Sequence, residues 1–293
     1  MNPVLIAGCG DIGQRVARPY RAQGIAVQGL ARSEARAARL RAEGIEPVLA
    51  DLADRGMLKD LPTAGAMVFY FAPPPTQGER DPLIQNFLTA IDPARRPAKL
   101  VLISTSAVYG DCQGAWITEA QAAEPQTARG RRRLDAENTL RRWGRETGVP
   151  CVILRVGGIY GPGRLPVARL QKGLPILEPA DSPYTNRIHQ DDLARVCVAA
   201  AQRGLAGEIY NVADGHPGTM SQYFIDVAKA LGLPPPPIVS RAEAEKVMSA
   251  GMLSYLRESR RLDNRKMREE LAVELQYPDL AAGLAALKNT PQQ

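Results

Sequence analysis

The sequence has few residues of the kinds that bind metal ions, and these are widely spaced. Its 293 residues include 2 histidines and 4 cysteines, which are Cys9, Cys112, Cys151 and Cys197. No two cysteines form a C-x-x-C pair, and zinc and iron sites usually need such spacing. We therefore expect no bound metal.

Long apolar runs and aromatic residues are also scarce. No stretch approaches the roughly 20 apolar residues of a membrane helix, so no membrane association is expected. Apolar, strand-like residues begin at position 4, which leaves no room for a signal peptide and predicts a cytoplasmic protein. Only 5% of the residues are aromatic, whereas 26 glycines and 24 prolines are typical of a compact α/β protein with tight connections.

Positive charge is in excess, with a net charge of +6, and arginines are densest between residues 129 and 145. Acidic residues recur there at helical spacing, which predicts a solvated helix whose charges compensate one another. No recognition motif accompanies the arginines, so no nucleic-acid partner is expected. The predicted pairs are Arg131–Asp135, Arg133–Glu137, Glu137–Arg141 and Arg142–Glu146.

Short apolar runs alternate with amphipathic stretches along the first half of the chain, which predicts βαβ units and a parallel sheet. Pro19 falls inside the first predicted helix and should kink it or end it early. The predicted strands are 4–7, 26–30, 47–50, 66–70, 100–103 and 151–154, and the predicted helices are 11–23, 34–43, 81–92 and 127–147.

Residues 156–186 are rich in glycine and proline and predict a loop-dominated insertion. Helical patterns resume at 191–203 and 219–232, with a strand at 209–212 between them. We expect an α/β fold, a doubly wound parallel Rossmann sheet with a smaller C-terminal substrate lobe. The expected nucleotide domain is 1–163, completed by 187–213, and the expected lobe is 164–186 with 214–293.

The sequence reads G-x-G-x-x-G directly after the first predicted strand. Gly8 would permit the tight turn, Gly10 the close approach of a pyrophosphate, and Gly13 close packing of helix on sheet. The amides around Ile12 would then face the phosphates at the helix N-terminus. Asp11 would repel that anion, so we expect it to turn away and cap the helix.

Arg32 and Ser33 follow the second predicted strand, where an NAD-selective site would place an acidic residue. They can bind a 2′-phosphate, which favours NADP over NAD, although NAD remains possible. Ser33 also reads as an ordinary helix cap, and both roles are compatible.

Two further segments are predicted to line the cofactor. Asp51 and Leu52 follow the third strand, where a carboxylate could meet the adenine amino group. Phe71, Ala72 and Pro73 follow the fourth strand and would form a backbone turn along the cofactor.

Several segments in order resemble the extended short-chain dehydrogenase/reductase family, the NAD-dependent epimerase/dehydratase group. They are residues 104–110 (S-T-S-A-V-Y-G), 154–163 (L-R-V-G-G-I-Y-G-P-G), 187–192 (R-I-H-Q-D-D), 209–212 (I-Y-N-V), 277–278 and 283–284. The resemblance implies a nicotinamide cofactor, a small-molecule or sugar-nucleotide substrate, and pairing into a homodimer.

The family's chemistry rests on Ser or Thr with Tyr-x-x-x-Lys. The resemblance implies that Thr105, with Ser106 as the neighbouring choice, hydrogen-bonds the substrate oxygen. The tyrosine and lysine positions hold Arg129 and Arg133. Arginine does not deprotonate in the working range, so Arg129 cannot shuttle a proton. Arg133 could still hold ribose hydroxyls, which makes the chain an atypical family member.

Four residues on neighbouring loops could replace the missing acid: Tyr109, Tyr160, Asp111 and His189. Packing explains these residues more simply than catalysis does. For His189 the simpler explanation is a hydrogen bond to a carboxylate, which would fix the turn before residues 191–203.

Two functions follow from these features. The first is an NADP-dependent oxidoreductase or epimerase-like protein acting on a small carbonyl or sugar-nucleotide substrate, with Arg187 and Arg260 or Arg261 as candidate anion clamps. The alternative is a catalytically impaired NADP-binding sensor or scaffold.

Overall fold

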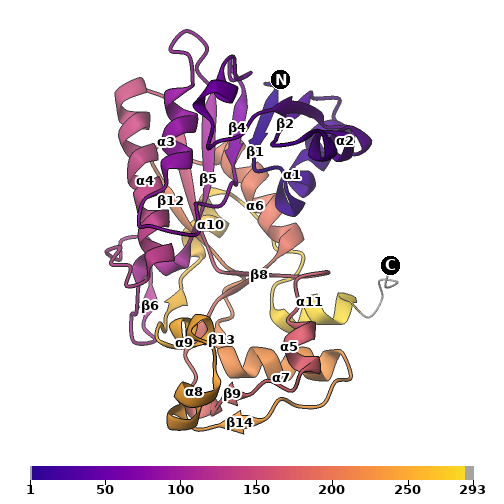
Figure 1. Ribbon diagram of the computed structural model, residues 1–293, viewed down its shortest axis with the longest axis vertical. Coiled ribbons are helices and arrows are strands. Elements are labelled where there is room, and N and C mark those ends of the chain that lie inside the picture. The colour runs from indigo at the N-terminus through magenta and orange to yellow at the C-terminus, as the bar shows by residue number, and fades with distance from the viewer. Residues whose placement is uncertain (1, 288–293) are drawn as a thin grey trace.

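The computed structural model describes residues 2–287 (Figure 1). A seven-stranded sheet in the order β12-β7-β5-β4-β1-β2-β3 forms its centre, and every neighbouring pair is parallel. Strand order reverses between β1 and β4, so the expected doubly wound Rossmann fold is confirmed. The strands are β1 (Val4–Ala7), β2 (Val27–Ala31), β3 (Glu46–Leu49), β4 (Met67–Tyr70), β5 (Lys99–Thr105), β7 (Cys151–Val156) and β12 (Ile209–Val212).

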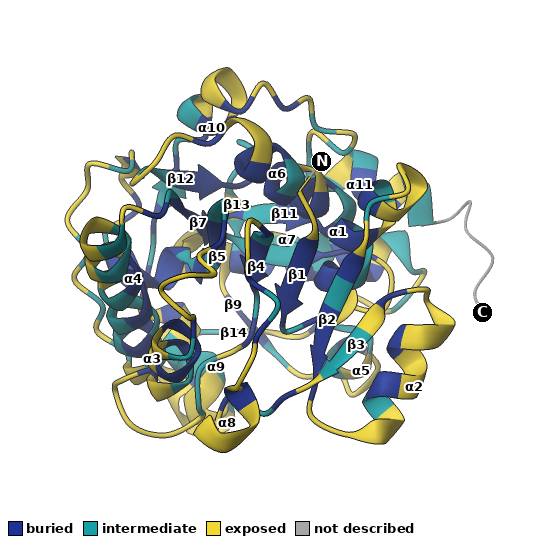
Figure 2. Ribbon diagram, turned by 90° about the horizontal axis from the view of Figure 1, so that it is seen from above, coloured by how far each residue is buried: buried dark blue, intermediate teal, exposed yellow. Residues whose placement is uncertain are grey.

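Helices cover both faces of this sheet, because alternate residues of a buried strand face opposite sides. Val4 and Ile6 of β1 belong to the core under α1, α2 and α6, whereas Leu5 and Ala7 belong to the core under α3 and α4. Figure 2 shows most of this sheet buried between helices whose outer sides are exposed, while the edge strand β3 is more open to solvent. The helices are α1 (Asp11–Ala22), α2 (Glu34–Ala42), α3 (Pro82–Thr89), α4 (Ala128–Thr147) and α6 (Gln190–Arg203).

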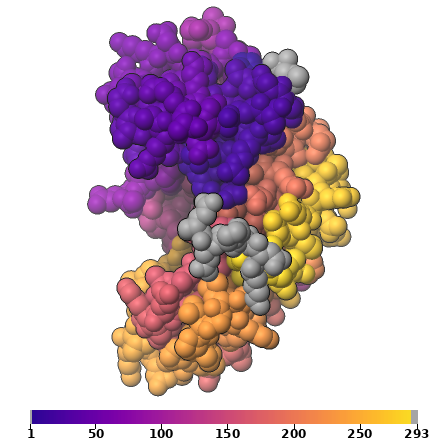
Figure 3. All heavy atoms as spheres, turned by 90° about the vertical axis from the view of Figure 1, so that its right-hand side faces the viewer, coloured from indigo at the N-terminus to yellow at the C-terminus, as the bar shows by residue number. Residues whose placement is uncertain are grey.

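A second, smaller body lies beyond the carboxyl ends of the strands (Figures 1 and 3). Its apolar core is built around Leu177, Phe224, Val227, Leu256 and Leu284. It contains α5 (Val167–Gln171), β9 (Ile176–Leu177), β10 (Tyr184–Thr185), β13 (Gly218–Thr219), α7 (Met220–Ala230), β14 (Ile238–Val239), α8 (Arg241–Val247), α9 (Ala250–Leu256) and α11 (Leu280–Leu287).

Short elements connect the two bodies. β8 (Gly158–Tyr160) pairs with β11 (Arg187–His189), and β6 (Trp116–Ile117) pairs with β15 (Arg261–Leu262). The helix α10 (Arg265–Glu270) returns to the sheet, where Met267 joins the core beside β12. The division of the chain into two domains at the expected boundaries stays a prediction, and residues 288–293 of the expected lobe lie outside the described residues.

Two local expectations were wrong. α1 continues through Pro19 to Ala22 and does not end early, because a proline so close to the C-terminal end removes only a late hydrogen bond, while a kink there stays a prediction. None of the four expected ion pairs along α4, all within described residues, lies within 4 Å. Arg131 instead pairs with Glu79 at 2.8 Å, and the buried Glu137 pairs with Arg155 at 2.7 Å, since one face of α4 packs against the sheet.

Within residues 2–287 no helix is both long and apolar enough to cross a bilayer. The same residues hold no group of three or more His, Cys, Asp or Glu side chains that could bind a metal ion.

Candidate functional site

The glycine loop between β1 and α1 has the geometry of a phosphate cradle. Gly8 has a φ of +89°, and a Cβ there would lie 2.4 Å from the backbone nitrogen of Ala72. A Cβ at Gly13 would lie 3.1 Å from Cγ2 of Ile6, so helix and strand are in close contact. A Cβ at Gly10 would have no heavy atom within 4 Å. This side of the loop is therefore open to a ligand.

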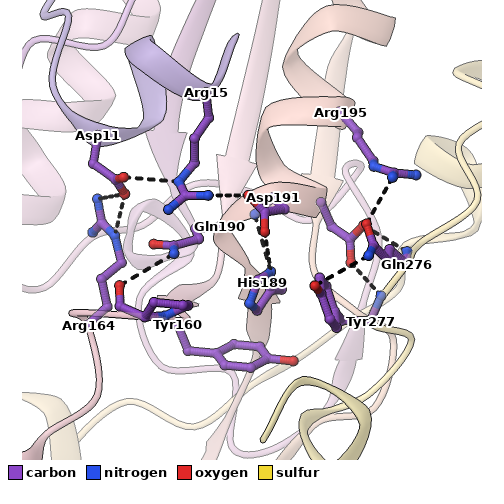
Figure 4. Close-up of polar contacts among 12 residues, drawn as sticks. Asp11, Arg15, Tyr160, Arg164, His189, Gln190, Asp191, Arg195, Gln276 and Tyr277 are labelled. Atoms are coloured by element: carbon purple, nitrogen blue, oxygen red, sulfur yellow. Dashed lines mark hydrogen bonds and ion pairs between the residues drawn. The ribbon is translucent and has the colours of Figure 1, made fainter. Parts of the chain in front are cut away.

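Asp11 does not cap α1, so that expectation was wrong. The cap residue is Gly10, and no side chain bonds the free amides of the first turn. Asp11 is the first helical residue, and its carboxylate accepts hydrogen bonds from Arg15 Nε at 2.9 Å and Arg164 Nε at 3.0 Å (Figure 4). The amides of the turn, including that of the buried Ile12, therefore remain available to an anion.

The end of β2 presents two arginines, of which the sequence predicted one. Arg32 is exposed, and Ser33 caps α2 by accepting from the Arg36 amide at 3.3 Å, which confirms its capping role. The Arg36 guanidinium donates to the carbonyl of Cys9 in the glycine loop. Its place one turn into α2, directly before the buried Ala37, is a signal that could have indicated this contact.

Cys9 itself is not a reactive thiol. Burial raises the pKa of the Cys9 thiol to about 11, although the Arg36 charge opposes this shift. A protonated thiol is a weak nucleophile, so Cys9 packs the loop against the sheet.

The segments after β3 and β4 reach the same edge of the sheet. Asp51 accepts from the Ala53 amide at 2.9 Å, and Leu52 is buried beside it. Phe71 donates its amide to Ala7 at 2.7 Å, which aligns Ala72 against Gly8. The exposed Pro73 follows. Contact of these residues with a cofactor stays a prediction.

The hydroxyl groups after β5 differ in their surroundings. Thr105 is half-buried and caps a 3₁₀ turn, Ser106–Tyr109, by accepting from the Ala107 amide at 3.3 Å. Ser106 is buried, with 8% of its surface exposed. Ser104 is buried and donates to the buried Glu137, so its hydroxyl group has a structural role. Thr105 is thus the more accessible candidate for a substrate oxygen.

Arg133 extends from α4 to the ends of two central strands. Its Nη1 donates to the carbonyls of Ile103 at 3.2 Å and Ala72 at 3.3 Å. Burial lowers the pKa of Arg133, and the nearby Asp81 and Tyr70 oppose the shift. The guanidinium remains a cation, because an arginine stays protonated throughout the working range. Arg133 therefore places a positive charge beside the expected cofactor segment.

Arg129 lies one helical turn before Arg133 in α4 and extends toward the second body. Its guanidinium lies over the ring of Tyr255 from α9, 3.6 Å from the ring centroid. Arg129, for which the resemblance predicts the tyrosine position, thus contacts the second body through a cation–π interaction.

Each tyrosine considered as a replacement acid is engaged in packing. Tyr109 donates to Asn211 at 2.7 Å, and burial raises its pKa to about 12. Tyr160 donates to the carbonyl of Asp279 at 3.0 Å, and burial raises its pKa further still. A general acid should have a pKa near the working pH, so neither tyrosine suits that role.

His189 and Asp111 also have structural partners. His189 caps α6, with Nδ1 accepting from the Asp191 amide at 3.3 Å, and its ring centroid lies 3.8 Å from that of Tyr277 (Figure 4). Burial lowers the pKa of His189, so its neutral form is favoured, and the Asp191 carboxylate lies 3.6 Å from Nδ1. Asp111 accepts from the Ser259 amide at 2.8 Å. These contacts favour the packing interpretation of both residues.

The candidate anion clamps are unequal. Arg260 pairs with Glu258 at 2.9 Å, and Arg261 donates to the carbonyl of Gly114 at 2.6 Å. Arg187 is half-buried, its guanidinium lies over the ring of Tyr223, 4.0 Å from the ring centroid, and its buried Nε has no partner among the described residues. Burial lowers the pKa of Arg187. The Nε of Arg260 also lacks a partner, but its two Nη atoms donate to Gly110 and Glu258, whereas Arg187 forms no ion pair among the described residues.

Asp214, next to Arg187, was not predicted from the sequence. Its Oδ1 accepts from the His216 amide at 2.9 Å, while its Oδ2 is buried without a partner among the described residues. Burial raises the pKa of Asp214 to about 7, against the opposing effect of the His216 amide. An isolated Asp in a G-rich segment carries no sequence signal for such a shift.

The sheet order and the glycine loop together define a doubly wound protein of the dinucleotide-binding class. The family model described as the NAD dependent epimerase/dehydratase family matches residues 4–213. The chain belongs to this family, which confirms the family resemblance drawn from the sequence and places the chain among enzymes.

Similar proteins cover almost the whole chain. Protein YeeZ of Escherichia coli (strain K12) is 28% identical over 288 residues, which are 95% of this chain and 97% of that protein. A functionally unknown conserved protein from Silicibacter pomeroyi DSS has a TM-score of 0.84 at 30% identity, covering 99% of both chains. The dTDP-glucose 4,6-dehydratase DesIV from Streptomyces venezuelae, solved with NAD and TYD bound, has a TM-score of 0.77 at 24% identity, covering 97% of this chain and 95% of that one.

Proposed function

We propose that the protein is an NADP-dependent oxidoreductase or epimerase-like enzyme that acts on a small carbonyl or sugar-nucleotide substrate. The open side of the loop at Gly10, at the point where strand order reverses, is the observation that carries this proposal. Unpaired amides at the start of α1 fit a pyrophosphate there. Family relatives of similar fold were solved with NAD bound, which supports a nicotinamide cofactor.

The preference for NADP rests on charge at the end of β2. Arg32 is exposed there, and the Arg36 guanidinium donates to the carbonyl of Cys9 in the glycine loop. Two guanidinium groups favour a 2′-phosphate, whereas a ribose 2′-hydroxyl is usually bound by a carboxylate.

A bound nicotinamide would supply or accept a hydride at its C4 atom. Thr105 would donate its hydroxyl hydrogen to the substrate oxygen and so polarise the C–O bond. Arg133 would hold ribose hydroxyls and place a positive charge at the reacting end of the cofactor. Arg187 would bind an anionic group of the substrate through its free Nε–H. The second body would exclude water from the bound substrate.

Calorimetric titration with NADPH and NADH tests the cofactor, and optical NADPH oxidation over a panel of aldehydes, ketones and keto-sugars tests the reaction. Tighter binding of NADPH and turnover that falls on Thr105→Ala are expected. Absence of binding to either dinucleotide would refute the proposal.

A second candidate function is a nucleotide-binding sensor or scaffold that has lost turnover. It is favoured by Arg129, which occupies the tyrosine position and is held against Tyr255. Cofactor binding without oxidation of NADPH by any substrate of the panel would support it.

The cytoplasmic location and the homodimer also stay predictions, and light scattering would test the homodimer.

A further inference from the structure

Arg164 lies on the turn that leads from β8 into α5, and it reaches the glycine loop. Its amide donates to the carbonyl of Gly161 at 3.0 Å, and Gln190 of α6 donates to the carbonyl of Pro162 at 3.4 Å. From this turn, Nε and Nη2 of Arg164 both lie 3.0 Å from Oδ2 of Asp11 (Figure 4). A cation from a segment more than half the chain away is thus held at the start of α1.

The charge of Asp11 is compensated on both of its oxygens. Arg15 Nε lies 2.9 Å from Oδ1, and Arg15 also pairs with Asp191 at the start of α6. Two carboxylates and two guanidinium groups therefore balance. A free carboxylate in the first turn of α1 would repel a phosphate bound at the same helix end. The network removes most of that repulsion.

Arg164 also has N–H groups that bond no protein acceptor. A guanidinium carries five N–H groups, and only those on Nε and Nη2 have partners. Within residues 2–287 no group accepts from Nη1, and 34% of the side chain is exposed. Asp11 directly follows Gly10, where a Cβ would meet nothing within 4 Å. The guanidinium is thus held at the residue that follows the open side of the cradle, with Nη1 free of a protein acceptor.

We propose that Arg164 binds the pyrophosphate of the dinucleotide, and that Asp11 is the positioning residue that orients it. This inference rests on the proposed function. It explains why an acidic residue stands in a phosphate-binding loop: the carboxylate is the anchor for an arginine from outside the loop. Cofactor binding then ties the turn after β8 to the cradle.

The alternative is that Arg164 only neutralises Asp11, and a double-mutant cycle separates the two roles. NADH and NADPH are titrated calorimetrically into the wild type, Arg164→Gln, Asp11→Asn and the double variant, at low and high KCl. Loss of one charge-assisted contact should weaken binding of both dinucleotides by about tenfold at low salt, and less at high salt. A smaller but measurable loss is expected when Arg164→Gln is added to Asp11→Asn, because the substituted amide oxygen orients Arg164 less firmly than the carboxylate does.

Arg195→Gln is the matched control, because Arg195 is an exposed arginine of α6 that bonds Gln276 away from the loop. It should leave both dissociation constants unchanged, and melting temperatures check that all variants fold. No effect of Arg164→Gln in the Asp11→Asn background would overturn the inference and leave Arg164 as a neutraliser. A loss confined to NADPH would also overturn it, by assigning Arg164 to the 2′-phosphate. If the wild type binds neither dinucleotide, the proposed function itself fails.

Discussion

The two halves of the sheet edge use different means to build a site. Around β1, β2 and β4 the geometry belongs to the backbone: a left-handed glycine, a close approach to Ala72 and a helix with free amides. Around β5, α4 and β12 it belongs to side chains, where Arg133, Arg187 and Asp214 are charged groups with restricted access to water. A backbone site survives most substitutions, whereas a side-chain site changes its chemistry with one or two.

The largest expected effect concerns the backbone half. Gly10→Val should abolish dinucleotide binding while leaving the melting temperature nearly unchanged, because its side chain would fill open space that a pyrophosphate needs. Gly8→Ala is the contrasting variant. Its Cβ would lie 2.4 Å from a backbone nitrogen at a φ of +89°, so it should also destabilise the fold. Calorimetry and thermal melts of both variants check this, and undiminished binding by a folded Gly10→Val would place the cradle elsewhere.

The next effect concerns the side-chain half. Arg129→Tyr with Arg133→Lys should raise residual hydride transfer by about 100-fold, the lower end of what general acid–base catalysis contributes. The single Arg129→Tyr should do less, because its phenol would lack the lysine that lowers its pKa. NADPH oxidation over the carbonyl panel measures the gain. Fast turnover by the wild type would contradict the expectation, and Thr105→Ala would then show whether the hydroxyl assignment survives.

Buried charge in the side-chain half should make stability depend on pH. The pKa of Asp214 is raised from 3.8 to about 7 by burial, so the folded state binds this proton more tightly than the unfolded chain. The stabilisation is complete below pH 4 and is lost as pH rises through about 7.

Asp214→Asn should remove this dependence and raise the free energy of unfolding at pH 8 by about 2 kcal/mol relative to the wild type. Urea melts from pH 4 to pH 8 measure it, with the exposed Asp181→Asn as the control. Parallel pH profiles for the wild type and Asp214→Asn would show that Asp214 titrates normally.

The smallest expected effect returns to the end of β2. Arg32→Glu should weaken NADPH binding by about tenfold and leave NADH binding unchanged or slightly tighter, since an exposed charge contact is screened by solvent. The ratio of the two dissociation constants is the measurement. Equal affinities for NADPH and NADH in the wild type would remove the basis for an NADP preference, and an unaffected ratio in the variant would transfer the role to Arg36.

Much of the fold could be predicted because its signals are local. Apolar runs of strand length alternate with helical patterns, and each of the six strands predicted up to residue 154 lies within two residues of an observed one. The glycine spacing predicted the loop because a side chain is excluded at each glycine for a different steric reason. The predicted ion pairs along α4 were wrong because i,i+4 spacing does not indicate which face of the helix is buried. Glu137 lies on the buried face and pairs with Arg155 in the core.

The sequence by itself determined the doubly wound sheet and the glycine loop, and it predicts that Arg129 and Arg133 replace the family's tyrosine and lysine. Each follows from residue type and spacing within one segment. Only the tertiary structure decided the partners of Asp11, the contact of Arg36 with Cys9 and the burial of Asp214. Those contacts join residues that lie far apart in the chain, and their energies depend on distance and access to water, which spacing along a sequence does not encode.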